Sequence, residues 1–193
     1  TTRVNYLLQM NSLHLKQAIT KFRQGGVIAY PTEGVFGLGC IPAFQDSAYR
    51  ILNLKQRSVE KGLILVASSI EQLEEYVYFE NLPTIEQVRA SWPGPVTWLI
   101  PAKKNTPIWL TGSHETLAVR VSAHPIIIAL CRKLGPIIST SANPAGLEPA
   151  ITTHEVFTYF GRELDYVIPA DIKKKLKPTE IRDAQNGNII RKN

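Results

Sequence analysis

The chain has 193 residues, 44% of them hydrophobic and 20% charged, which is ordinary for a soluble globular protein and fits a single domain over residues 1–193. Its 22 Lys and Arg against 16 Asp and Glu give a net charge of +6, enough to attract a nucleotide or an RNA but too little to indicate a nucleic-acid-binding protein by itself. Two widely separated cysteines and the lack of a long apolar run argue against a disulfide framework, a cysteine zinc site and a membrane span, so we expect a cytoplasmic protein.

The start of the chain predicts a helix, a strand and a glycine-rich turn. Apolar residues recur at helical spacing over residues 12–24, and residues 27–30 form a short apolar run closed by Pro31, as in a strand that is buried on both faces. The glycines at positions 34, 37 and 39 match neither the dinucleotide-binding fingerprint nor a P-loop. We interpret them as a turn and a strand with close backbone approach.

The middle of the chain alternates helical and strand patterns. Asp46 is a candidate N-cap for a helix over residues 46–55, and residues 62–67 form an apolar strand. At Ser69 and again at Thr84, a hydroxyl residue stands three positions before Gln. This capping-box spacing predicts helices that begin near Ile70 and Ile85. The second of these must end at the Trp-Pro-Gly-Pro sequence of residues 92–95.

The remainder of the chain predicts strands over residues 96–100, 117–121, 136–138 and 166–168, a helix over 124–134, a helix capped by Thr153 that runs to Phe160, and a hairpin that turns at Asn186-Gly187. Strands that alternate with helices along the whole chain indicate an α/β fold. We therefore predict a single α/β domain with a mixed parallel and antiparallel sheet flanked by helices.

Three cations lie close together in the sequence: Lys55, Arg57 and Lys61, between a predicted helix and a predicted strand. Two interpretations are open. The cations form a phosphate site on a mobile segment over residues 55–62, or they decorate the end of a helix, where the macrodipole favours basic side chains.

Arg120 is the second candidate, because on its predicted strand it shares a face with the small residues Thr116, Ala118 and Ser122. A partly buried guanidinium needs an anion, either the carboxylate of a ligand or an internal Asp or Glu. Residues 139–143, Ser-Thr-Ser-Ala-Asn, bring three hydroxyls and an amide to the end of a strand. Open α/β sheets bind ligands at such ends, although a capping or Asx turn uses the same residue types.

The remaining polar candidates give weaker signals. Thr32 and Thr179 each follow a proline, and either a turn bond or a ligand contact explains such a hydroxyl. The four histidines have no metal-ligand spacing, which favours solvated or capping roles. Several cations and hydroxyls, without an obvious nucleophile or general base, suit phosphoryl or nucleotidyl transfer, in which positioning and charge stabilisation supply most of the catalysis.

Six separated motifs, in order and in spacing, resemble the short, single-domain bacterial form of the YrdC/Sua5 family; they lie at residues 30–39, 55–57, 92–97, 118–121, 139–143 and 178–183. The resemblance covers nearly the whole chain. It implies a twisted α/β domain around a large cationic concave surface. It also implies threonylcarbamoyl-AMP synthase activity, which condenses L-threonine, bicarbonate or CO2 and ATP to threonylcarbamoyl-adenylate and pyrophosphate, for threonylcarbamoyl-adenosine modification at position 37 of tRNA.

The resemblance further assigns roles to individual residues. The phosphates of ATP would contact Lys55 and Arg57, the two catalytic cations, with Lys61 nearby, while the rest of the nucleotide would contact Thr116, Ser141, Asn143 and Arg191. Arg120 would hold the threonine carboxylate, in a subsite also lined by Thr32, Ser139 and Thr179. Magnesium would enter on the triphosphate without a dedicated protein metal site. Closure of residues 55–62 would protect the labile adenylate from water.

The chain departs from the family pattern at two places. Thr179 stands where the family commonly has Ser, and the Lys-rich run 173–177 replaces a stretch that is often Gly-rich. That run either contacts tRNA, which is otherwise reached through a partner threonylcarbamoyl-transferase complex, or forms a solvated loop. Two other functions stay open: a structured-RNA-binding module in ribosome or tRNA maturation, and a related enzyme that acts on carbamoyl phosphate.

Overall fold

The computed structural model describes residues 2–172 and 179–192, with side chains from residue 12 onward. Its strands are β1 (Ile28–Pro31), β2 (Phe36–Cys40), β3 (Leu65–Ala67), β4 (Val96–Pro101), β5 (Thr116–Val121), β6 (Ile137–Ser141), β7 (Tyr166–Val167), β8 (Glu180–Asp183) and β9 (Ile189–Arg191). They form one sheet in the order β7-β1-β2-β6-β3-β5-β4-β8-β9. The pairs β1/β7, β3/β5 and β4/β8 are parallel and the others antiparallel, which confirms the predicted mixed sheet.

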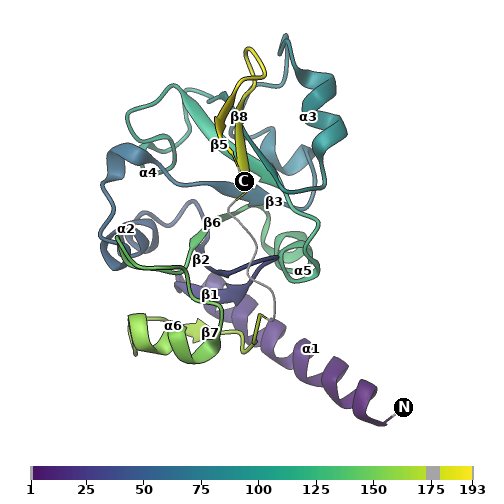
Figure 1. Ribbon diagram of the computed structural model, residues 1–193, viewed down its shortest axis with the longest axis vertical. Helices are drawn as coiled ribbons and strands as arrows, with labels where there is room; N and C mark the ends of the chain where they lie inside the picture. The colour runs from purple at the N-terminus through teal and green to yellow at the C-terminus, as the bar shows by residue number, and fades with distance from the viewer. Residues whose placement is uncertain (1, 173–178, 193) are drawn as a thin grey trace.

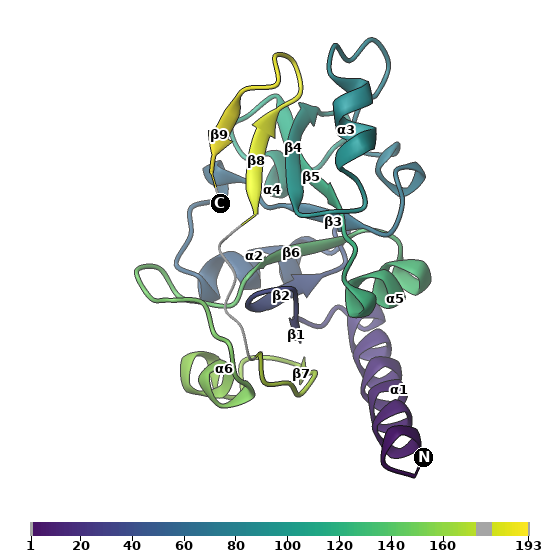
Figure 2. The same cartoon turned by 45° about the vertical axis from the view of Figure 1, so that its right-hand side comes forward.

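The helices that accompany this sheet are α1 (Thr2–Arg23), α2 (Gln45–Leu54), α3 (Ile85–Ser91), α4 (Ile108–Thr111), α5 (Pro125–Leu134) and α6 (Thr153–Phe160), together with the short 3-10 helices η1 (Val59–Lys61) and η2 (Glu71–Leu73). Figure 1 shows α1 and α5 side by side, with β8 and α3 at one end of the molecule and α6 at the other. Turning the molecule brings β9 into view beside β8 (Figure 2). In the part of the chain that the structure describes, no helix is long and apolar enough to cross a membrane.

Both faces of the sheet carry apolar side chains. On β1, Ile28 and Tyr30 pack with α1 and α5, while Ala29 packs with α6, and all four residues of the strand are buried. The prediction of a strand buried on both faces is therefore confirmed. A larger core cluster fills the space between the sheet and α2, α3 and α4; Trp98 is its largest fully buried member.

Neither of the two predicted capping boxes is present. The helix expected near Ile70 is reduced to the three-residue η2, because the Gln72 side chain accepts hydrogen bonds from the main chain and hydroxyl of Ser68. Helix α3 begins at Ile85 as predicted, but the Thr84 hydroxyl donates to the carbonyl of Ala184 at 2.7 Å and caps nothing. The Thr84 hydroxyl thus bonds to a carbonyl that is distant in sequence and not to the N-terminal turn of its own helix.

Three further boundaries also differ from prediction. Helix α2 starts one residue before Asp46, with Phe44 as its N-cap residue. Strand β6 continues to Ser141, so the polar residues expected in a turn lie partly on a strand. Helix α6 is capped by Thr152 in a capping box, while the Thr153 hydroxyl pairs with the main chain of Ala170.

Candidate functional site

Strand β5 supplies one wall of the candidate site. Leu117, Val119 and Val121 are buried in the large core, so Thr116, Ala118, Arg120 and Ser122 lie on the opposite face, as the alternation predicts. Thr116 and Arg120 are four residues apart on this face, which separates them by roughly 13 Å at about 3.3 Å per residue. The two residues are therefore too far apart on this face to contact one small group together.

Arg120 is 6% exposed and pairs with Glu33, whose Oε1 accepts from Nη1 at 3.2 Å. The Ser122 hydroxyl donates to the same oxygen at 3.1 Å. Burial raises the pKa of Glu33, but Arg120, together with weaker contributions from hydrogen bonds and His124, outweighs that effect and holds the pKa below its usual range. Of the two anions left open for Arg120, the internal carboxylate is present in this structure, and a ligand carboxylate would have to share the guanidinium.

His124 stands beside this ion pair, at the N-cap position of α5. Its main-chain N–H donates to the Ser122 hydroxyl at 3.0 Å, but its side chain makes no capping bond. Among the residues that the structure describes, its Nδ1 is buried without a hydrogen-bond partner. Burial lowers the pKa of His124, Glu33 raises it and Arg120 lowers it further, with a net decrease. The Nδ1 of His124 therefore neither faces solvent nor caps the helix, in contrast to the solvated or capping role expected from the sequence.

Ser139 is held by a buried tyrosine. The Tyr30 hydroxyl donates to the Ser139 Oγ at 2.8 Å, across the intervening strand β2. A Cβ at Gly39 would lie 2.8 Å from the Tyr30 hydroxyl and 2.5 Å from the Ile138 carbonyl oxygen. The glycine therefore leaves room for the ring to cross β2, which is the close approach predicted from the glycine pattern.

Lys55 joins the first cation cluster to the Ser-x-Asn sequence. At the C-terminal end of α2, its Nζ donates to the carbonyl oxygens of Ser141 at 2.5 Å and Asn143 at 3.1 Å, and lies 3.3 Å from the Asn143 Oδ1. Burial, and secondarily the charge of Arg57, lower the pKa of Lys55 to about 8. Three residues that the sequence assigned to one nucleotide site are thus in direct contact.

Arg57 and Arg191 lie near each other although they are far apart in the sequence. Arg57 donates to the Gly62 and Lys61 carbonyls at 3.2 and 3.4 Å, and Arg191 donates to the Thr179 carbonyl at 2.8 Å. Burial lowers the pKa of both guanidinium groups, and the charge of Arg191 lowers that of Arg57 further. Neither forms an ion pair within the described residues. Two adjacent cations of this kind favour an anion between them.

The segment between Lys55 and Gly62 has a defined conformation. It contains η1, and its Glu60 carbonyl accepts from the main chain of Ser113 at 3.0 Å, just beyond α4. A Cβ at Gly112 would lie 2.2 Å from that carbonyl oxygen. Lys61 is exposed here. Mobility of this segment stays a prediction, and opening it would break its contacts with α4.

The threonines are held by turn and strand neighbours. The Thr32 hydroxyl donates to the Val35 carbonyl at 2.6 Å, which is the turn bond that the sequence left open. The Thr179 Oγ1 lies 3.3 Å from the Oγ1 of Thr97, a fully buried residue of β4. The Lys-rich run 173–177, for which a tRNA contact or a solvated loop was expected, lies outside the described residues.

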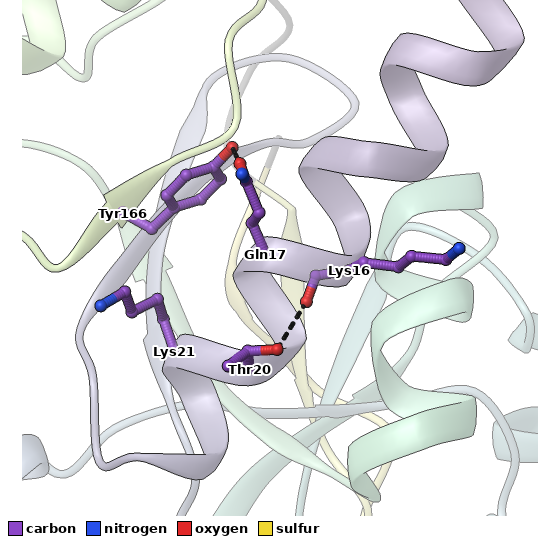
Figure 3. A pocket seen from close by; sticks show the side chains of 5 residues that line it. All are labelled: Lys16, Gln17, Thr20, Lys21 and Tyr166. Carbon is purple, nitrogen blue, oxygen red and sulfur yellow. Dashed lines mark hydrogen bonds between the residues drawn. The ribbon is translucent and has the colours of Figure 1, made fainter.

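Cavities elsewhere in the molecule do not coincide with this site. One of about 320 Å³ lies between α1 and Tyr166 (Figure 3), where Lys16 and Lys21 extend in different directions and thus do not converge on one ligand. Another, of about 550 Å³, adjoins the Lys55 turn through Gln56 and Pro144. No group of three or more His, Cys, Asp or Glu side chains is arranged for a metal ion in the part of the chain with assigned structure.

Fold and site together define a mixed-sheet α/β protein in which the cations Lys55, Arg57 and Arg191 form a cluster from distant parts of the chain. The model of the Sua5/YciO/YrdC family, described as "Telomere recombination", matches residues 20–193. The chain therefore belongs to the Sua5/YciO/YrdC family.

Relatives and solved structures agree with this assignment. The chain is 52% identical over 170 residues to the threonylcarbamoyl-AMP synthase of Nitrosococcus oceani, covering 88% of this chain and 92% of that one. It is 45% identical over 191 residues to the enzyme of the same name from Cellvibrio japonicus, covering 98% and 95%. E. coli YciO superposes with a TM-score of 0.82 at 27% identity, covering 94% and 89%.

A longer structural neighbour is Sua5 of P. abyssi, which was solved in complex with L-threonine. It superposes with a TM-score of 0.79 at 30% identity, covering 88% of this chain. Our chain spans 50% of the length of that Sua5 chain.

Proposed function

We propose that the protein is a threonylcarbamoyl-AMP synthase, which condenses L-threonine, bicarbonate and ATP to threonylcarbamoyl-adenylate and pyrophosphate. The names of the relatives that match nearly the whole chain support this activity, as does the L-threonine bound to P. abyssi Sua5. The observation that carries the proposal is the arrangement of charge. Arg57 and Arg191 are neighbouring cations that form no ion pair within the described residues. Arg120 and Glu33 form a separate ion pair of opposite charges.

The cation cluster is the ATP end of the site. Lys55 and Arg57, the catalytic cations, and Arg191 contact the triphosphate, Lys61 reaches it from the exposed segment, and the nucleotide also contacts Thr116, Ser141 and Asn143. Repulsion between Arg57 and Arg191, which lowers the pKa of Arg57 in the free protein, is relieved once a phosphate lies between them. Magnesium enters as the MgATP substrate, held by phosphate oxygens.

The ion pair is the threonine end. Arg120 binds the carboxylate of L-threonine through its guanidinium fork, and Thr32, Ser139 and Thr179 line this side of the site. Ser139 is the best positioned of these hydroxyls, because its bond from the buried Tyr30 leaves its own proton available to a ligand.

The proposed reaction takes place between the threonine end and the ATP end of the site. The threonine amine and bicarbonate give a carbamate, whose oxygen attacks the α-phosphorus of ATP while the bond to pyrophosphate breaks. Charge develops on phosphate oxygens in this step, and the preorganised cations stabilise it. The product is a labile mixed anhydride, and closure of residues 55–62 would exclude water from it.

The product then supplies tRNA modification in the cytoplasm, by direct contact with tRNA or through a partner transferase complex. The run 173–177 is a candidate tRNA contact by its charge alone.

Pyrophosphate release tests this proposal. With ATP and bicarbonate present, release should require L-threonine and be much slower with L-serine. Release at the same rate without any amino acid would contradict it, and binding of tRNA without ATP turnover would favour the alternative of an RNA-binding module.

A further inference from the structure

Buried polar atoms in folded proteins nearly always have a hydrogen-bond partner, so an orphaned one calls for an explanation. Within the described residues, the Nδ1 of His124 is buried and lacks a partner. The atom lies at the threonine end of the site, beside groups that carry the charges for amino-acid binding. Because this atom is closed to solvent in the free protein, a substrate atom becomes its partner only if L-threonine binding displaces the groups that cover it.

The main chain of His124 is tied to the ion pair by a short chain of hydrogen bonds, which places its imidazole beside the pair. The main-chain N–H of His124 donates to the Ser122 hydroxyl at 3.0 Å, and this hydroxyl donates to Glu33 Oε1 at 3.1 Å. The same carboxylate oxygen accepts from Arg120 at 3.2 Å. Glu33 and Arg120 are the charged groups that act on His124. One oxygen of Glu33 thus ties β5, the turn after β1 and the start of α5 together.

An α-amino acid is a zwitterion, and a guanidinium beside a carboxylate matches both of its charges. Arg120 would take the carboxylate, which leaves Glu33 facing the ammonium group. We propose that Glu33 and His124 form the amino-group subsite, in which His124 Nδ1 accepts the proton that the threonine amine loses when it is carboxylated. This inference rests on the proposed function and adds a proton acceptor, which that function lacks.

The ionisation states of both groups suit these roles. Burial is the main cause of the lowered pKa of His124, so the imidazole is neutral near pH 7. With its proton on Nε2, it presents a lone pair at Nδ1. Glu33 keeps its negative charge because Arg120 and the neighbouring hydrogen bonds outweigh burial.

The proton balance requires one acceptor. Threonine ammonium and bicarbonate give the N-carboxylate, one water and one proton: the N–C bond forms, a C–O bond of bicarbonate breaks, and its oxygen leaves as water. His124 takes the remaining proton and becomes an imidazolium, whose charge Glu33 stabilises. The anionic carbamate is then ready to attack the α-phosphorus.

Two variants separate proton acceptance from binding. His124→Asn places an amide oxygen near the position of Nδ1, so it accepts a hydrogen bond but no proton. We expect L-threonine affinity within about threefold of wild type, and threonine-dependent pyrophosphate release slower by about 100-fold, the usual range for a general base. His124→Ala should lose both. Because the pKa of His124 is lowered, wild-type activity should fall only when the pH drops below the ordinary pKa of histidine and the imidazole becomes protonated, and the Asn variant should lack this fall.

Thermal melting and ATP affinity serve as controls for folding. In addition, 15N spectra of histidine-labelled wild-type protein follow the imidazoles without any substitution, and L-threonine should shift one signal of the four histidines. An Asn variant with wild-type rate and pH profile, or no imidazole shift on L-threonine binding, would overturn the inference. If wild-type protein shows no threonine-dependent release, the proposed function itself fails, which is a distinguishable result.

Discussion

Arg120 shows how a single side chain can keep a full charge available in a buried place. Its side chain is 7% exposed and is paired with the Glu33 side chain, which is 30% exposed, so the carboxylate is the more accessible partner. A buried cation without any anion would cost several kcal/mol. Glu33 therefore maintains the site in the absence of substrate, and the two charges remain adjacent for a zwitterion.

Replacing this arginine tests its assignment. We expect Arg120→Ala to weaken L-threonine binding by about 2–5 kcal/mol, because a desolvated charge pair is lost. Arg50→Ala is the matched control, since Arg50 pairs with Asp165 at 2.9 Å on an exposed surface, where such pairs contribute about 0–1 kcal/mol. Calorimetric titration measures both, and unchanged threonine affinity in Arg120→Ala would remove this residue from the site.

Lys55 gives the site a pH dependence. Its pKa of about 8 is lower than that of an exposed lysine because the ammonium is buried beside Arg57. As pH rises through this value the free protein loses the charge, so ATP must bind with uptake of a proton. We expect ATP affinity to be about tenfold weaker at pH 9 than at pH 7 if only the charged form binds. Titration of ATP at both pH values measures this.

The control for this pH effect is Lys55→Arg, which keeps its charge at both pH values and should lose the tenfold difference. The same linkage acts on stability with a defined sign. Since the unfolded chain holds the proton to a higher pH than the folded protein does, the contribution of Lys55 to stability should rise with pH above about 8. Identical pH dependence of ATP binding in the variant and in wild type would contradict the role of Lys55.

At the level of elements, hydrophobic periodicity predicted the strands and long helices well. Strands β4 and β5 and helix α5 agree within a residue or two, because each has a clear apolar pattern, and β4 and α5 also have a proline or glycine at the end. Capping signals were less reliable. At Thr84 and Thr153, a main-chain carbonyl from a distant segment accepts the hydroxyl, and no local pattern reveals such a partner.

The grouping of Lys55 with Ser141 and Asn143 was predicted from the resemblance to the family, because the short motifs alone left a helix end and a polar turn as alternatives. Lys55, Ser141 and Asn143 are in contact, although the contact joins residues 86 and 88 positions apart. Glu33 and His124 were not identified as site residues. The available signal was Arg120, which required an anion; Glu33 was present in a matching motif, but the antiparallel and crossover connections that bring it to β5 are set by the whole sheet.

The segment over residues 55–62 depends on a glycine in its neighbour. Gly112 has φ of 63° and lies so close to Glu60 that an added Cβ would be 2.2 Å from its carbonyl oxygen. Gly112→Ala should therefore displace the segment that carries Arg57 and Lys61. We expect a loss of stability of about 1–3 kcal/mol from backbone strain, together with weaker ATP binding. Chemical denaturation and ATP titration measure the two effects.

Gly135→Ala provides the comparison. This glycine also has positive φ, at 79°, but no atom lies within 4 Å of the position of a Cβ. With ψ at −165°, Gly135 has a backbone conformation that is almost restricted to glycine, so the variant should be less stable by about 1–3 kcal/mol from this strain alone and should bind ATP as wild type does. If both variants bind ATP normally, the close contact with α4 does not control the phosphate site.

At the scale of the whole molecule, the net charge of +6 would attract tRNA as well as ATP, so tRNA binding and adenylate formation need separate tests. Phosphate contacts with tRNA release counterions, so we expect tRNA binding to weaken steeply as salt rises from 50 to 200 mM. Threonine-dependent pyrophosphate release should proceed without tRNA. A strict requirement for tRNA in that assay would contradict the proposed order, in which the adenylate forms before tRNA is involved.

The most direct test of the proposed function is the fate of isotopically labelled bicarbonate. With 13C-bicarbonate, L-threonine and MgATP, mass spectrometry of the reaction mixture should detect threonylcarbamoyl-adenylate that carries the label, formed in proportion to pyrophosphate and absent when L-threonine is omitted. Pyrophosphate formed without a labelled adenylate, under conditions in which the product is stable, would contradict the account.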